Sequence, residues 1–189
     1  MNPMLKMAAL SRDQIEREAL ALVQEFCPEL LREPGPFPME EFLDTGLKPI
    51  TGFEFYVSEE LGAAVDGLTS PLDKELILSA ATFDQLPTGG RALFTAAHEV
   101  GHVLLHADQV RERFANGLDT VLHRKANLKA YEDPEWQANT FAAALLMPLP
   151  AVQKLMRLGE SIGDVANIFK VSHSAAQIRV EKLRAAGLI

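Results

Sequence analysis

Apolar positions in the first part of the chain repeat at helical spacing. They follow Ser11 and Gln14, whose separation is that of a capping box at a helix start. The apolar positions on one helical face are Ile15, Ala19, Leu22 and Phe26. The proline-rich stretch 32–38 ends this predicted helix, and a shorter helix over "MEEFLDTG" is expected to stop at Gly46.

Apolar and polar residues then alternate, which is typical of a strand with one buried face. In "FEFYVS" the alternating residues on one face are Phe53, Phe55 and Val57. The stretch "KELILSAA" offers a second short run of the same kind. These runs predict a small sheet between Gly52 and Thr82.

Helical patterning returns in "RALFTAAHEVGHVLLH", which predicts a helix from about Gly90 to His106. Few of its residues are polar apart from the histidines and Glu99, so we expect this helix to be buried at the centre of the fold. The following stretch, Ala107 to Tyr131, is irregular and mixed in charge. It predicts a long, partly exposed loop with one helical turn at "VRERFA".

Asp133 and Pro134 have the pattern of an N-cap followed by a first-turn proline, so another helix begins there and runs to Pro148. A further helix over "PAVQKLMRLG" precedes two more, joined by a tight turn at 170–172. We therefore expect an α+β fold that is mostly helical, with a small sheet against the histidine-containing helix. The predicted division is a domain at 1–149 and a helical tail at 150–189.

Charge is unevenly distributed along the 189 residues. The net charge is −8, yet the tail from residue 150 onward holds six basic residues against three acidic ones, which leaves −11 on the remainder. Only this tail has the charge to meet nucleic acid directly. The composition, 48% apolar and 23% charged, is that of an ordinary globular protein with a sizeable core.

A single cysteine, Cys27, excludes an internal disulfide framework and suits a reducing compartment. The first residues turn charged too early for a signal peptide, and no apolar run approaches the ~20 residues of a membrane span. We therefore expect a cytoplasmic protein that does not act at a membrane.

The stretch "HEVGH" has the spacing of a metal site. His98 and His102 are four residues apart, so in a helix they project from one face, ~6 Å apart along the axis, and both can reach one ion. Glu99 is rotated away and can act as the base that takes a proton from the attacking water. Nitrogen ligands with a carboxylate favour zinc. The competing interpretation is a buried helix whose histidines are satisfied by ordinary hydrogen bonds.

Gly101 lies within this helix, where glycine costs roughly 1 kcal/mol relative to alanine. A missing side chain beside a ligand indicates that another element packs very close there. The same packing would occur in a helix without metal, so Gly101 does not distinguish the two interpretations.

A catalytic zinc site needs a third protein ligand, and the nearby candidates are acidic residues and histidines. They are His106, Asp108, His123, Glu132, Asp133 and Glu135. His106 is ~12 Å from His98 by helical rise, so we expect it to have a structural role, and the same objection applies to Asp108. Glu135 shares a helical face with Asn139 and is the preferred ligand, with Glu132 as second choice.

The motifs "RALFTAAHEVGHVLLH" and "EWQANTFAAALLMP" together closely resemble the ImmA/IrrE family of zinc metallo-endopeptidases. The resemblance implies a zincin-like core, a Zn²⁺ ion held by His98, His102 and Glu135, and Glu99 as the catalytic carboxylate. It also implies a protein substrate, typically a helix-turn-helix repressor cleaved in stress response or in the release of mobile elements.

The tail has the form of a helix-turn-helix. Its inward residues are expected to be Ala166, Phe169, Ile178 and Leu183, with Ser172 capping the second helix. Residues free to face a DNA groove would be His173, Gln177, Arg179, Lys182 and Arg184. We favour a tail that packs on the peptidase, because its charge is weak for DNA binding.

Two further alternatives remain open from the sequence. The chain could be a DNA-binding regulator whose zinc is structural or sensory, although such a site has no need of Glu99. A peptidase also needs a donor to stabilise the oxyanion, and the candidates lie in the predicted loop. They are His123, Arg124 and Tyr131.

Overall fold

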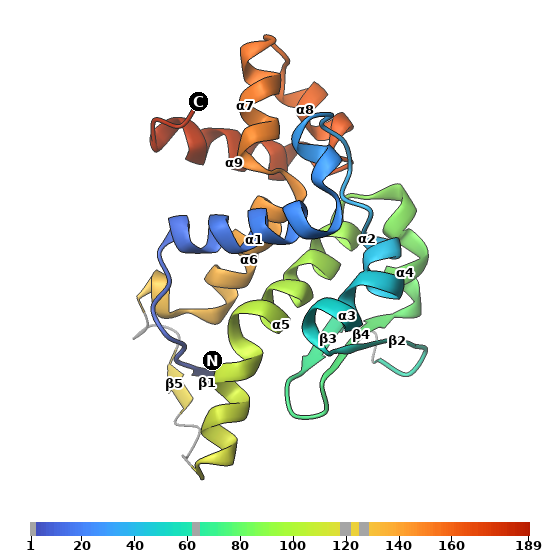
Figure 1. Ribbon diagram of the computed structural model, residues 1–189, viewed down its shortest axis with the longest axis vertical. Coiled ribbons are helices and arrows are strands. Elements are labelled where there is room, and N and C mark those ends of the chain that lie inside the picture. Colours follow the sequence, from blue (N-terminus) through green and yellow to red (C-terminus); the bar gives the residue numbers. More distant parts are fainter. Residues whose placement is uncertain (1–2, 62–64, 118–121, 125–128) are drawn as a thin grey trace.

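The computed structural model describes residues 3–61, 65–117, 122–124 and 129–189. One long helix, α5 (Arg91–Ala115), runs through the middle of the molecule, and the other elements pack around it (Figure 1). The remaining α-helices are α1 (Arg12–Phe26), α2 (Met39–Glu41), α3 (Leu47–Thr51), α4 (Ala80–Gln85), α6 (Pro134–Leu146), α7 (Leu149–Arg157), α8 (Ile162–Ile168) and α9 (His173–Ala185). Shorter helical turns are η1 (Pro28–Leu31), η2 (Phe42–Gly46), η3 (Leu86–Thr88) and η5 (Ala130–Glu132).

A three-stranded mixed sheet lies against one side of α5 (Figure 1). Its strands are β2 (Glu54–Ser58), β3 (Gly67–Ser70) and β4 (Glu75–Ser79), with β4 in the centre. β2 runs parallel to β4, pairing Phe55 with Leu76, and β3 runs antiparallel to it. Leu76 and Leu78 of β4 are fully buried. The sheet therefore contributes its central strand to the core.

The opposite side of α5 is covered by α6, which in turn packs on α1 (Figure 1). The capping box expected at the start of α1 is present, with Ser11 and Gln14 bonded to each other's backbone. β1 (Pro3–Leu5) and β5 (Leu122–Arg124) form a separate antiparallel pair near the far end of α5. The predicted fold, mostly helical α+β with a small sheet against the histidine helix, is confirmed.

The expected loop from Ala107 to Tyr131 is wrong over its first part, because α5 continues to Ala115. The stretch 107–115 holds no glycine or proline and is rich in residues with high helix propensity, so nothing ends the helix at His106. The turn at Gly117 (φ 61°) comes only after Ala115. The rest of the expected loop contains β5 and η5, together with residues 118–121 and 125–128, which lie outside the described residues.

The expected helix end at Gly46 is also wrong. The helical segment runs without interruption from Met39 through η2 and α3, and it ends at Gly52 in the left-handed conformation (φ 75°). Gly46 lies inside this segment, and the Phe26 ring packs against it. A Cβ added at this position would lie 2.6 Å from the Phe26 Cε2 atom, so a side chain here would clash with the ring. The glycine meets a need for space and does not end the helix.

The C-terminal helices pack back on the rest of the chain. Arg179 of α9 is 4% exposed, donates to the carbonyl of Met147, and forms a two-bond ion pair with Glu16 of α1. Leu183 is buried as expected, whereas Ile178 is 48% exposed and does not join the core. The division at residue 149 stays a prediction. Among the described residues, no helix has both the length and the apolar character needed to cross a membrane.

Candidate metal centre

Two antiparallel helices, α5 and α6, bring the predicted ligands together. At their crossing, a Cβ added to Gly101 would lie 3.2 Å from the Cα atom of Ala138 and 3.3 Å from its carbonyl oxygen. The close approach expected from this glycine is confirmed, because an added side chain would crowd the Ala138 backbone and push the two helices slightly apart. The approach brings the first turn of α6 against the histidine face of α5.

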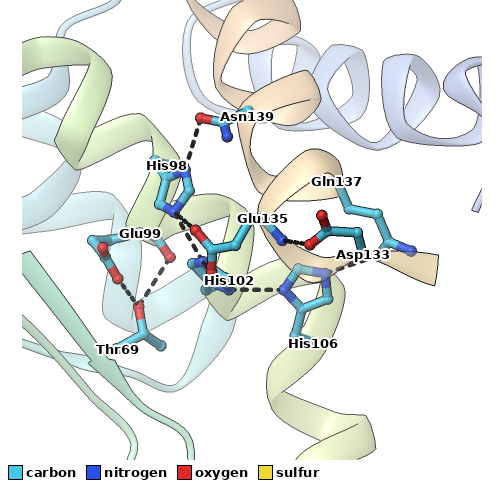
Figure 2. A network of polar contacts seen from close by, with 9 residues as sticks. All are labelled: Thr69, His98, Glu99, His102, His106, Asp133, Glu135, Gln137 and Asn139. Atoms are coloured by element: carbon cyan, nitrogen blue, oxygen red, sulfur yellow. Dashed lines mark hydrogen bonds and ion pairs between the residues drawn. The ribbon is translucent and has the colours of Figure 1, made fainter. Parts of the chain in front are cut away.

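The start of α6 fixes where Glu135 lies. The Asp133 side chain accepts a hydrogen bond from the Glu135 backbone nitrogen at 3.0 Å, as an N-cap residue does, and Pro134 occupies the first turn. This cap sets the entry of α6 so that Glu135 points toward α5, between His98 and His102 (Figure 2).

Three possible ligand groups meet at one place: His98, His102 and Glu135. The Nε2 atoms of the two histidines lie 2.9 Å apart, and the carboxylate oxygens of Glu135 lie 3.4 Å and 3.5 Å from them. Ligand atoms bound at 2.0–2.1 Å to one tetrahedral ion are about 3.3 Å from each other. The observed spacings therefore fit one ion of zinc's size, held by two nitrogens and one carboxylate.

Electrostatics at this cluster favour a bound cation. Hydrogen bonds to His102 and His98 hold the pKa of Glu135 far below its usual range. Burial lowers the pKa of His98, but Glu135, Glu99 and Asn139 outweigh it and raise that pKa above its ordinary value. The pocket of negative and electron-donating groups thus attracts positive charge, whether as protons or as a metal ion.

Behind His102, a chain of hydrogen bonds runs through His106 to Gln137 (Figure 2). The Gln137 Nε2 group donates to the carbonyls of Ala8 and Tyr131, at 2.9 Å and 2.7 Å, so its Oε1 atom is the acceptor for His106 Nε2–H at 2.8 Å. His106 Nδ1 is then an acceptor, and it takes the proton of His102 Nδ1 at 2.9 Å. This leaves the Nε2 lone pair of His102 directed at the cluster.

His98 is oriented in a similar way from α6. Its Nδ1 atom lies 3.2 Å from Asn139 Oδ1, an amide oxygen that accepts the ring proton and leaves Nε2 free for an ion.

Burial lowers the pKa of His106 to about 4, with His102 contributing further, so His106 stays neutral at physiological pH. A neutral His106 is what the acceptor role of its Nδ1 atom requires.

Glu99 lies on the other side of the histidines, toward β3 (Figure 2). It is 9% exposed, and its Oε2 atom accepts a hydrogen bond of 2.7 Å from the Thr69 hydroxyl. Gly67 leaves room for it, because a Cβ there would lie 2.9 Å from the Glu99 Cγ atom. The sheet edge therefore positions this carboxylate beside the cluster without making it part of the cluster.

The other candidate ligands lie elsewhere. Glu132 pairs with Lys6 at 2.9 Å, and the Asp108 side chain is 97% exposed and pairs with Arg111. Tyr131, in η5, is 40% exposed, and its carbonyl accepts the Gln137 bond. His123 stands in β5 opposite Met4, and its side chain, like that of Arg124, lies outside the described residues.

Sequence reasoning missed two supporting residues, Thr69 and Gln137, and it also missed that His106 forms a hydrogen bond with His102. The four-residue spacing of His102 and His106 on a buried face was the available signal for this hydrogen bond. Gln137 gave a weaker signal, because Asn139 and Thr140 are also polar residues of the same helix. Thr69 gave no signal, because its neighbour Glu99 comes from an element 30 residues away.

The fold and the site together define a class: an HExxH helix whose two histidines meet a glutamate at a spacing that could hold a metal ion, with a further carboxylate beside them. The chain belongs to the peptidase family M78, described as the IrrE N-terminal-like domain, whose sequence profile matches residues 87–181. The matched segment contains all of α5 and α6. The resemblance seen in the sequence motifs is confirmed.

Among solved structures, a Mycobacterium tuberculosis transcriptional regulator is similar, with a TM-score of 0.57 and 15% sequence identity. The likeness covers 87% of this chain and 45% of that one, so this chain spans less than half the length of the regulator. At this level of identity the likeness shows a shared fold alone. A comparison with curated proteins gave no match.

Proposed function

We propose that the protein is a zinc-dependent endopeptidase. The observation that carries the proposal is the meeting of His98, His102 and Glu135 at ligand spacing, with Glu99 held beside them and not among them. A purely structural zinc site is usually closed by four protein ligands, whereas a catalytic one has three and an open position. The part-exposed side chains of the three residues, 17%, 20% and 40%, agree with an open site.

When bound, zinc would lower the pKa of water toward ~7 and stabilise negative charge on the substrate carbonyl oxygen. Glu99 supplies the proton transfer. Thr69 engages one oxygen of its carboxylate, so the other is the one that takes a proton from the attacking water and passes it to the leaving amine. The hydrogen bonds from His98 to Asn139 and from His102 to His106 hold both rings in orientation.

Donors for the oxyanion remain a proposal from the sequence. His123 and Tyr131 are the candidates, and both belong to the stretch between α5 and α6. Replacing each in turn by phenylalanine should separate them, since the stabilising residue loses kcat with little change in KM.

The metal assignment is tested by a matched pair of variants. Glu135→Gln should retain less zinc after dialysis than the wild-type chain, because it removes one ligand charge. Glu132→Gln, which changes a carboxylate three residues away that pairs with Lys6, should retain the wild-type amount. Elemental analysis of the purified proteins measures both, and equal zinc in Glu135→Gln and wild type would reject the assignment.

For the substrate we propose a DNA-binding repressor, cut at one site in the cytoplasm, in stress response or in the release of mobile elements. The family resemblance supports this, and the acidic body, at −11 outside the tail, suits encounter with a basic partner. Incubation of the zinc-loaded protein with its presumed repressor and with unfolded casein tests it. One defined repressor cut that needs Glu99 agrees with the proposal, and rapid casein digestion beside an intact repressor contradicts it.

The alternative, a DNA-binding regulator with a sensory zinc, rests on the tail. Two of the five residues considered for a DNA groove have other surroundings: Arg179 is buried in its ion pair with Glu16, and Lys182 lines a cavity bounded by α5, α6 and α9. A salt-dependent DNA-binding assay of the whole chain distinguishes the alternatives, because the peptidase proposal expects only weak, non-specific binding.

A further inference from the structure

A cavity of about 420 Å³ lies beside the candidate metal centre, bounded by α5, α6 and α9. Phe94 precedes His98 by four residues on α5, and Asn139 follows Glu135 by four on α6. Because the two helices are antiparallel, one turn back along α5 and one turn onward along α6 lead to the same place. Asn139 belongs to both, since it lines the cavity and contacts His98.

The walls of this cavity are mostly apolar, and α9 closes it. Phe94 and Ala143 form the side made by α5 and α6, while Ile178 and Leu183 come from α9. Ile178 is 48% exposed although it is large and apolar. Its exposure is accounted for if the cavity is a binding site, because the apolar wall is then covered when a ligand is present.

Four cationic side chains also line the cavity, and two of them are already neutralised. Arg91 pairs with Asp66, and Arg179 pairs with Glu16.

The other two cations, Arg12 and Lys182, have no carboxylate partner among the described residues. Burial and the charges of Arg12 and Arg179 together lower the pKa of Lys182. Two uncompensated cations beside an apolar wall are stabilised by an anion placed between them.

We propose, building on the endopeptidase function, that this cavity is a specificity pocket that takes a large apolar side chain of the substrate next to an acidic residue. Four residues along a helix rise ~6 Å, and an extended peptide advances ~3.3 Å per residue. A substrate whose scissile bond lies at the metal centre would thus insert the side chain about two residues from the cut. The adjacent carboxylate would meet Arg12 and Lys182.

Binding can be tested without any cleavage, using anilinonaphthalene sulfonate, a fluorescent probe that joins an apolar ring system to an anion. We expect one saturable site on the whole chain. Ile178→Glu should weaken it at least tenfold and Lys182→Gln about fivefold. The matched controls on the outer face of α9, Gln177→Glu and Arg184→Gln, make the same charge changes outside the cavity and should stay within twofold of wild type.

Displacement of this probe then identifies the occupant. An acetylated, amidated hexapeptide with Leu-Glu at its centre should displace the probe at a concentration at least fivefold lower than the same peptide with Leu-Lys. Displacement by octanoate but by neither peptide would overturn the proposal in favour of a small-acid site. A probe site that is absent, or that Ile178→Glu and Lys182→Gln leave unchanged, would overturn the pocket itself.

Cleavage of a peptide mixture by the zinc-loaded protein separates this proposal from the one on which it rests. Cuts with an apolar–acidic pair about two residues away, lost in Ile178→Glu, agree with both proposals. Cuts without that preference overturn the pocket assignment. Complete absence of cleavage, of the mixture and of the presumed repressor alike, contradicts the endopeptidase function, while the displacement experiment still decides what the pocket binds.

Discussion

His102 shows how a buried hydrogen-bond chain orients a candidate metal ligand. Two backbone carbonyls fix the amide of Gln137, that amide fixes the proton of His106, and His106 in turn holds the proton of His102 on Nδ1. Each step follows from which atoms can donate and which can accept. The sequence indicated only that His106 is structural, and its partners could not be predicted, because Gln137 comes from another helix.

Replacing His106 by leucine should lower zinc affinity about 10–100-fold, as loss of a supporting hydrogen bond typically does. His106→Gln keeps an acceptor for the His102 proton and should recover much of the loss. Competition with a chromophoric chelator measures both affinities, with His173→Ala, an exposed histidine on α9, as the control. If the leucine variant holds zinc as tightly as wild type, the hydrogen-bond chain through His106 has no role in ligand positioning.

Cys27 carries a second residue-scale prediction. Burial, with Glu29 and Glu41 adding to it, raises the pKa of its thiol from 9.0 to about 12. The folded chain therefore keeps the thiol protonated where the unfolded chain ionises it, so stability falls as the pH rises from about 9 toward 12. Urea unfolding at pH 8 and pH 10.5 should show this loss, and Cys27→Ala should reduce it. An equal pH dependence in both proteins would show that the Cys27 thiol is not the cause of the loss of stability.

At the scale of elements, the site depends on how closely α5 and α6 approach. The sequence predicted both helices, the cap at Asp133 and the close packing at Gly101, because each leaves a local pattern. It did not predict that α5 continues to Ala115, since mixed charge without a breaking residue is as compatible with an exposed helix as with a loop. It also took Gly46 for a helix end, because a glycine required for Phe26 packing looks the same in sequence.

Gly101→Val should therefore separate the helices. The added side chain would press on the Ala138 backbone, and overpacking of this kind typically costs about 1–3 kcal/mol. Urea unfolding measures the loss, and zinc content should fall with it. The same substitution at Gly163 in α8, where only the Ser161 hydroxyl oxygen is near at 3.5 Å, is the matched control and should change stability by less than about 0.5 kcal/mol. Equal effects at the two glycines would mean that the helix contact is not the cause.

At the scale of the whole molecule, the C-terminal helices are joined to the N-terminal helix by Arg179 and Glu16, 163 residues apart. Arg179 also donates to the Met147 carbonyl at the end of α6, so it connects α9, α6 and α1. The sequence placed Arg179 among residues able to face DNA, because a buried arginine and an exposed one have the same helical periodicity. Its partly buried partner, Glu16, was too distant in sequence to be recognised.

Arg179→Leu should destabilise the protein by about 3–5 kcal/mol, since it leaves the Glu16 carboxylate, 14% exposed, without its partner. The double variant Arg179→Leu with Glu16→Leu removes both charges and should recover most of that loss. Urea unfolding of the three proteins measures the coupling. Additive losses in the double variant would show that the pair does not join the tail to the body.

The measurement that tests the central claim most directly compares zinc-loaded wild type with Glu99→Gln on the same peptide mixture, with zinc content determined on the same samples. Glutamine keeps the shape of the side chain and removes the base. The account predicts equal zinc in both proteins and a cleavage rate about 10²–10⁴-fold lower in the variant. Cleavage by Glu99→Gln at the wild-type rate, or no cleavage of either the mixture or the presumed repressor by the zinc-loaded wild type, would contradict it.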